Sequence, residues 1–241
     1  MPLLSESFEV VTFDRRGHSQ SESASTQGSF AEDANDLGSL IDALGLAPAH
    51  VVGTSGGAII ALRLAAKRPE LFRTLLVHEP PLLGLLEGQA AFKPMIDEFQ
   101  EPLHAVVELL QAGDHQAAAR YFVEHVAFGA GAWDTLPPPV RETFIHNAPT
   151  FLDETRDPDG LTSDLPFLCR FDRPTLVTAG TESPPFFKPI VDLVAHALPM
   201  SSVHVYAGAG HAPHLSHPAA YVETVRQFCS KAESAQVVPS T

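Results

Sequence analysis

The chain has 241 residues, of which 44% are hydrophobic and 18% charged, so it is long enough for a globular core and too apolar for a disordered chain. Its formal net charge of -14 disfavours nucleic acid and anionic membrane surfaces as partners. The start of the chain lacks the pattern of a signal peptide, and we expect Cys169 and Cys229 to be buried thiols of a cytoplasmic protein.

The first third of the chain alternates short apolar runs with helical patterns. Strands are predicted at 8–13, 50–53 and 71–78, and helices at 29–46 and 57–68. Ser29 and Gly45 are placed to cap the first helix. Strands joined by single helices imply parallel β-α-β units with helices on both faces of the sheet. The fold class is therefore α/β, with a mostly parallel sheet flanked by helices.

The middle of the chain shows only helical patterns of apolar residues, and strand patterns return in the last third. Helices are predicted at 91–112, 114–128 and 140–155, then a strand at 173–180, a helix at 190–198, a strand at 203–206 and a helix at 219–231. We therefore divide the chain into a first core segment (1–82), a helical cap insertion (83–170), a second core segment (171–234) and a disordered tail (235–241).

The sequence Gly53-Thr54-Ser55-Gly56-Gly57 matches the pattern G-x-S-x-G and stands directly between a predicted strand and a predicted helix. At such a junction the chain turns sharply and exposes the serine hydroxyl at the helix N-terminus, where the N–H of Gly56 favours negative charge. The alternative role is a glycine-rich turn with a serine N-cap. The placement favours Ser55 as a nucleophile.

The chain resembles the α/β-hydrolase fold family over almost its whole length, most of all small serine esterases and cofactor-free haloperoxidase-like hydrolases. Residues 14–21 (DRRGHSQS) are similar to the family's D-x-R-G-x-G-x-S segment, with Ser19 in place of a glycine. Residues 51–81 resemble its elbow strand, helix and following strand. Residues 174–180 are similar to its late strand, and 208–211 to its histidine loop.

The resemblance implies that His211 is the general base, because it stands in a glycine-rich loop after the last strand. A base must reach the serine hydroxyl with one ring nitrogen and face a carboxylate with the other. His214 and His217 share the loop, but the Gly-x-Gly-His pattern favours His211.

Two residues are candidates for the acid. The family usually places it after the glycine matched to Gly180, but its position is occupied here by Ser183, one residue after Glu182. Neighbours on an extended chain point to opposite sides, which counts against Glu182. Glu79 follows the strand after the elbow helix, where some family members carry the acid. We favour Glu79 and keep Glu182 as the alternative.

The start of the chain departs from the family pattern. Strands and a His-Gly loop, the source of a second oxyanion donor, normally precede the segment matched to residues 9–21, where this sequence has only MPLLSES. Loss of one oxyanion donor costs on the order of 10²–10³ in turnover. We expect a truncated product, rather than a partner that supplies the missing parts.

These residues imply a serine hydrolase that cleaves an ester or related acyl bond through an acyl-enzyme. No metal or organic cofactor is expected, and the expected partner is a small-molecule acyl substrate, with a homodimer left open. The alternative function is a non-catalytic or truncated binding protein on the same fold, since a fold alone does not define an activity.

Overall fold

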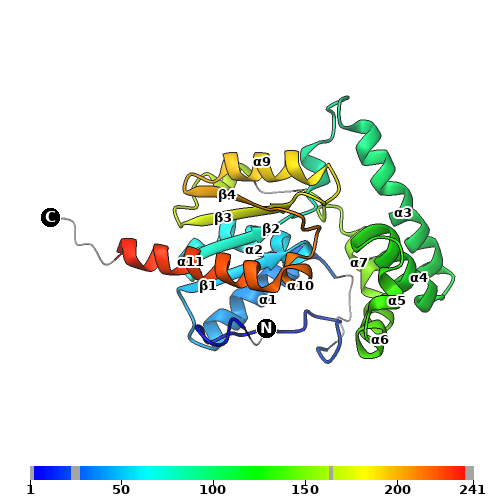
Figure 1. The fold of residues 1–241 in the computed structure, drawn as a ribbon, viewed down its shortest axis with the longest axis horizontal. Helices are drawn as coiled ribbons and strands as arrows, with labels where there is room; N and C mark the ends of the chain where they lie inside the picture. Colours follow the sequence, from blue (N-terminus) through cyan, green and yellow to red (C-terminus); the bar gives the residue numbers. More distant parts are fainter. Residues whose placement is uncertain (1–2, 23–27, 163–164, 237–241) are drawn as a thin grey trace. The chain divides into compact units, whose positions relative to one another are not determined.

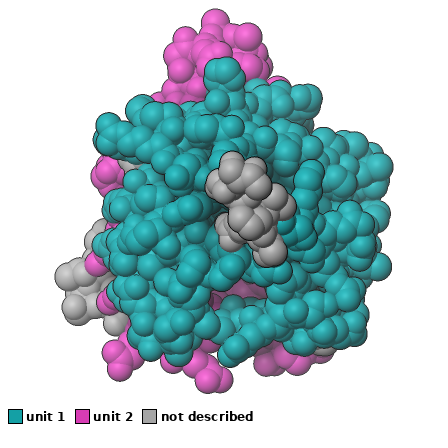
Figure 2. Space-filling model, turned by 90° about the vertical axis from the view of Figure 1, so that its left-hand side faces the viewer, with its two compact units in different colours: residues 1–12, 34–82, 163–241 teal, residues 13–33, 83–162 magenta. Residues whose placement is uncertain are grey.

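The computed structural model describes residues 3–22, 28–162 and 165–236. The chain forms two compact units, coloured separately in Figure 2. Unit 1 comprises residues 1–12, 34–82 and 163–241, and unit 2 comprises residues 13–33 and 83–162. The tail expected from residue 235 lies outside the described residues from 237 onward, and helix α11 reaches Gln236.

Unit 1 is built on a parallel sheet with the strand order β1-β2-β3-β4 (Figure 1). Its strands are β1 (Ala49–Thr54), β2 (Phe72–His78), β3 (Thr175–Gly180) and β4 (Ser201–Tyr206). Its helices are most of α1 (Phe30–Ala43), α2 (Gly56–Lys67), η1 (Pro69–Leu71), α8 (Leu165–Leu168), α9 (Phe187–Ala197), α10 (Pro213–Ser216) and α11 (Pro218–Gln236). The predicted α/β class and parallel sheet are confirmed.

The two faces of the sheet carry alternate residues of each strand, and helices cover both. On one face Leu76, Leu176 and Tyr206 form a buried cluster with Tyr221 and Val225 of α11. The other face presents a second set of buried side chains, which includes Val51, Leu75, Val77 and Val177. Figure 1 shows α11 and α2 on opposite sides of the sheet, so the strand ends are held in a fixed order by packing on both faces.

Unit 2 consists of helices, and its described residues contain no strand. The helices of unit 2 are η2 (Leu83–Leu85), α3 (Lys93–Gln111), α4 (His115–Phe122), the π-helical turn η3 (Val123–Ala127), α5 (Ala132–Thr135), α6 (Pro138–Asn147) and α7 (Thr150–Arg156). Two small apolar clusters stabilise it, one around Val106 and Leu110 and one around Val123 and Trp133. No helix of the described residues is both long and apolar enough to cross a membrane.

The structure corrects three expectations. Residues 8–13 form no strand, because β propensity produces a strand only where a neighbour pairs with it; Phe8 and Val10 pack on the α11 cluster instead. The helix expected at 140–155 is two helices, α6 and α7, since Pro149 cannot donate the hydrogen bond that would continue the first. Cys169 is exposed, while Cys229 is buried.

Candidate active site

The carboxyl ends of the four parallel strands lie at one edge of the sheet, and the candidate residues follow them directly. Ser55 comes after β1, Glu79 after β2, and His211 stands in the loop after β4. Thr54 is paired with His78, and Gly180 with Tyr206, so the strands end in register. Such an edge is where open α/β sheets bind their ligands.

Ser55 forms a strained turn between β1 and α2, with φ 55° and ψ −123°. Its N–H donates to the carbonyl of His78 over 2.9 Å, which fixes the turn to the end of β2. A side chain at Gly53 would collide with the backbone of Gly57, 2.7 Å from its carbonyl carbon, so only glycine fits there. The hydroxyl of Ser55 makes no capping hydrogen bond within the described part of α2, whose first residue is Gly56. Strain held by surrounding structure is typical of functional residues.

Glu79 is a fully buried carboxylate in a left-handed conformation, with φ 43° and 0% exposure. Its Oε1 accepts a hydrogen bond of 2.7 Å from the N–H of Gly180, and its Oε2 lies 2.7 Å from Nδ1 of His211. Burial alone would raise the pKa of this carboxyl, but the hydrogen bond with His211 and the adjacent His78 outweigh burial and lower the pKa to about 2. Glu79 is therefore ionised at neutral pH.

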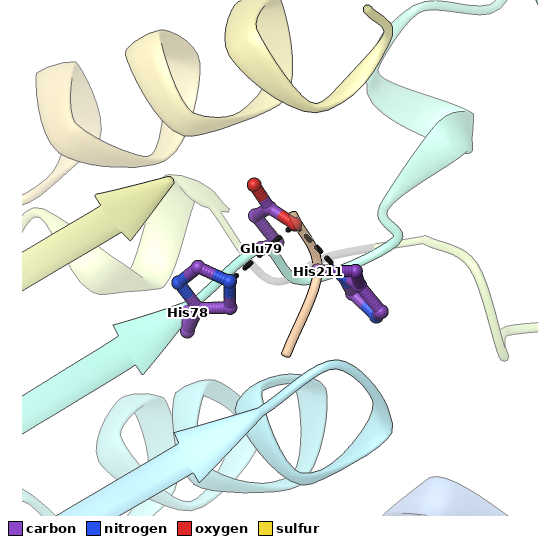
Figure 3. A group of neighbouring side chains, drawn as sticks. All are labelled: His78, Glu79 and His211. Atoms are coloured by element: carbon purple, nitrogen blue, oxygen red, sulfur yellow. Dashed lines mark hydrogen bonds and ion pairs between the residues drawn. The ribbon is translucent and has the colours of Figure 1, made fainter. Parts of the chain in front are cut away.

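Figure 3 shows Glu79 with a histidine on each side, His211 at its Oε2 and His78 nearby. The ring of His211 is stacked on Phe187 at the start of α9, with centroids 4.7 Å apart. A side chain at Gly180 would lie 2.8 Å from the carbonyl carbon of Ala209, so this glycine lets the histidine loop approach β3. The N–H of Glu182 donates to the Ala209 carbonyl over 2.9 Å, which ties the histidine loop to the segment directly after β3.

The other candidates point elsewhere. Glu182 is exposed, and its carboxylate accepts a hydrogen bond of 3.4 Å from the Thr181 hydroxyl. His217 contacts Ser216, with 2.9 Å between Nδ1 and Oγ. The ring of His214 packs edge-on against Tyr221 of α11. The structure thus brings Glu79 and His211 together and leaves Glu182 at the surface.

Sequence reasoning missed one residue of this cluster, His78. It is fully buried, with Nδ1 2.9 Å from the Thr178 hydroxyl and Nε2 3.4 Å from Oε2 of Glu79. At the end of an apolar strand a histidine resembles an ordinary core residue. The only available signal was a titratable side chain directly before a candidate acid.

His78, Glu79 and His211 offer three possible ligand atoms within 4.8 Å of one another. However, Oε2 of Glu79 and Nδ1 of His211 are 2.7 Å apart, whereas two ligands of a tetrahedral metal, each at about 2.1 Å, lie roughly 3.4 Å from each other. The spacing fits a hydrogen-bonded pair and does not fit a ligand set.

Unit 2 holds a second charged cluster, centred on Arg15. Its guanidinium forms ion pairs with Asp33, at 2.8 Å, and with Glu154. The same guanidinium lies 2.8 Å from Nε2 of His18, which also contacts the hydroxyl of Thr150. The cluster ties the loop that contains Arg15 to α1 and α7.

The alpha/beta hydrolase fold family matches residues 1–218 of this sequence, and the chain belongs to that family. Its hydrolase relatives and the four-stranded parallel sheet agree with this assignment.

Curated relatives of this chain are hydrolases by name. The uncharacterized hydrolase YraK of Bacillus subtilis (strain 168) is 37% identical over 98 residues, which are 40% of this chain and 35% of YraK. The chain thus matches about a third of the length of that relative. Zearalenone hydrolase of Cladophialophora bantiana is 26% identical over 234 residues, covering 93% of this chain and 81% of that enzyme.

Solved structures are similar over most of the chain. A hydrolase from Pseudomonas aeruginosa PA01 superposes with a TM-score of 0.71 at 25% identity, covering 94% of this chain and 82% of that one. Est816, an N-acyl homoserine lactone degrading enzyme, gives a TM-score of 0.66 at 25% identity, with 89% and 80% covered. A bromoperoxidase from Bacillus anthracis gives 0.71 at 21% identity, with 95% and 84% covered, which supports the fold alone.

Proposed function

We propose that this hydrolase is a serine hydrolase that cleaves an ester or related acyl bond through an acyl-enzyme. The observation that carries the proposal is the buried Glu79 carboxylate, hydrogen-bonded over 2.7 Å to Nδ1 of His211 at the same sheet edge where Ser55 forms a strained turn. A histidine held by a buried carboxylate is oriented for base catalysis, and its imidazolium form is stabilised.

In the proposed reaction the hydroxyl of Ser55 attacks the substrate carbonyl, and Nε2 of His211 accepts the hydroxyl proton. Glu79 holds Nδ1–H of His211 and stabilises the positive charge that forms on the ring. The N–H of Gly56, at the start of α2, donates to the oxyanion. His211 then returns the proton to the leaving group and activates the water that releases the acyl group. No cofactor takes part in these steps.

The names of two relatives narrow the substrates to be tried first. Est816 is a lactone-degrading enzyme, and the zearalenone hydrolase matches most of this chain. We therefore propose lactones and simple esters as the first substrate classes to assay.

The test is labelling with a fluorophosphonate probe, which reacts covalently with activated serines. The unsubstituted chain should be labelled on Ser55, and Ser55→Ala should lose both labelling and ester hydrolysis, by a factor on the order of 10⁶ in kcat. Ser39→Ala, which changes an exposed serine of α1, is the matched control and should keep both. Absence of labelling in the unsubstituted chain would favour the non-catalytic binding role instead.

A further inference from the structure

His78 is a buried titratable side chain that the proposed mechanism does not use. Its side chain and that of Glu79 are both 0% exposed. Its two ring nitrogens face different partners: Nδ1 lies 2.9 Å from Oγ1 of Thr178, and Nε2 lies 3.4 Å from Oε2 of Glu79. The same carboxylate oxygen contacts Nδ1 of His211, so two histidines share one acceptor atom.

The hydrogen bonds of Thr178 determine where His78 carries its hydrogens. A threonine hydroxyl has a single hydrogen, and Thr178 donates it to the carbonyl oxygen of Val77, 3.3 Å away. Thr178 can therefore only accept from His78, and the hydrogen between them belongs to Nδ1. Nε2 makes no hydrogen bond with any described residue, and a neutral ring with its hydrogen on Nδ1 would leave the electron-rich Nε2 only 3.4 Å from an ionised carboxylate oxygen. A second hydrogen, on Nε2, replaces that repulsion with an ion pair.

Charge balance at Glu79 leads to the same conclusion. A fully buried carboxylate is stabilised by hydrogen bonds, here from the N–H of Gly180 and from His211, and further by a nearby positive charge. His211 cannot supply it in the resting enzyme, because a general base must be neutral before it accepts a proton. Among the described residues, Glu79 forms ion pairs with His211 and His78. His78 is therefore the residue that can carry the positive charge.

The other titratable groups that face His78 do not carry a charge that would oppose a positive charge on His78. From β4, Tyr206 lies with its ring 6.0 Å away, and burial raises its pKa to about 12, so it stays neutral. From α10, His214 has a lowered pKa because of burial and of the nearby His78 and His211. Tyr221 of α11 contacts Tyr206 and His214, and burial raises its pKa as well. The other neighbouring ring, 6.0 Å away, is that of His211.

We propose that His78 is a protonated positioning residue, which neutralises Glu79 in the resting enzyme and thereby sets the pH at which His211 becomes a competent base. This proposal rests on the proposed function for its effect on catalysis. The imidazolium of His78 reduces the attraction of Glu79 for a second positive charge, so His211 releases its proton at a lower pH. Without His78, the full charge of the carboxylate acts on His211.

The test compares the full chain with His78→Gln, whose neutral amide keeps a hydrogen-bond donor. Ring-nitrogen NMR of ¹⁵N-histidine-labelled protein should show His78 as an imidazolium at pH 7 in the unsubstituted chain. In His78→Gln the protonation midpoint of His211 should rise by about one pH unit, and the acid limb of kcat/KM should rise with it. His196→Gln, an exposed histidine of α9, is the control and should shift neither.

A neutral His78 ring at pH 7, or a His211 midpoint that stays in place in His78→Gln, would overturn the proposal. If His78→Gln does not fold, Thr178→Val removes the acceptor of Nδ1–H with little change in shape, and a smaller rise in the same midpoint is expected. The NMR signals need no turnover. If Ser55 is not labelled while His78 is charged, the proposed function fails and the charge assignment stands.

Discussion

The two units each hold a cluster of opposite charges, but they build it from different groups. In unit 1 a carboxylate with 0% exposure sits beside two histidines. In unit 2 an arginine with a 23% exposed side chain sits beside Asp33 and Glu154. Histidine changes its charge near neutral pH, whereas arginine remains charged. The acid and base of unit 1 can therefore exchange a proton during a reaction, whereas the guanidinium at the centre of the unit 2 cluster keeps its charge and holds Asp33 and Glu154 together.

The largest expected effect comes from neutralising the carboxylate of unit 1. Glu79→Gln should lower kcat by a factor on the order of 10⁴, because the amide cannot stabilise the imidazolium of His211. Glu154→Gln weakens the cluster of unit 2, and Glu182→Gln changes the other acid candidate at the surface. Each of these should alter kcat less than about tenfold, since neither touches His211. If Glu182→Gln loses activity while Glu79→Gln keeps it, then Glu182 is the acid and our choice of Glu79 is wrong.

Acid should affect the two clusters in opposite directions. The folded chain lowers the pKa of Glu79 from 4.5 to about 2, so its contribution of about 3 kcal/mol is present above pH 4.5 and is lost as the pH falls toward 2. Burial raises the pKa of Asp33 from 3.8, against the opposing effect of Arg15, so its ionised form costs stability that acid restores. Hydrogen-exchange protection, measured from pH 6 to pH 3 and corrected for intrinsic rates, should fall more in unit 1. If both units lose hydrogen-exchange protection to the same extent as the pH falls, the expected difference between the two clusters is wrong.

Replacing a glycine with alanine should change the free energy of unfolding more in unit 1 than in unit 2, and this is the smallest of the expected effects. Gly53→Ala should cost about 1–3 kcal/mol in the free energy of unfolding and reduce labelling of Ser55, because the new methyl group meets the backbone of Gly57. Gly57→Ala, whose methyl group would meet nothing within 4 Å, should gain up to about 1 kcal/mol as a better helix former. In unit 2, Gly28→Ala makes ordinary contact with Asp153 at 3.4 Å and should change stability by less than about 0.5 kcal/mol. Urea denaturation checks all three.

Local sequence patterns predicted the strands, turns and helices around the site, but they predicted the side-chain contacts within the site less well. The elbow at Ser55 could be predicted because a strand, a small-residue turn and a helix follow one another directly. The sequence favoured Glu79 over Glu182 but could not predict the contact of Glu79 with His211, since Glu79 has a left-handed backbone conformation that no propensity predicts for glutamate. His78 was missed because its role depends on Thr178, 100 residues further along the chain.

The same limit explains the error at residues 8–13. A β-branched and aromatic run indicates a tendency to be extended, but a strand also needs a partner, and pairing is a long-range property. Helices depend on local bonds, so α1 begins after Ser29, whose hydroxyl accepts the N–H of Glu32 over 3.2 Å, and ends before Gly45, at φ 65°, as its caps predict.

The unequal exposure of the two cysteines gives the protein a ready-made attachment point for a spectroscopic reporter. Cys169 is exposed, whereas burial raises the pKa of Cys229 to about 11 and keeps it in the unreactive thiol form. A maleimide dye should therefore modify one position of the unsubstituted chain. Combined with a fluorophosphonate dye on Ser55, it would place a donor and an acceptor within unit 1, so energy transfer could follow the unfolding of that unit alone.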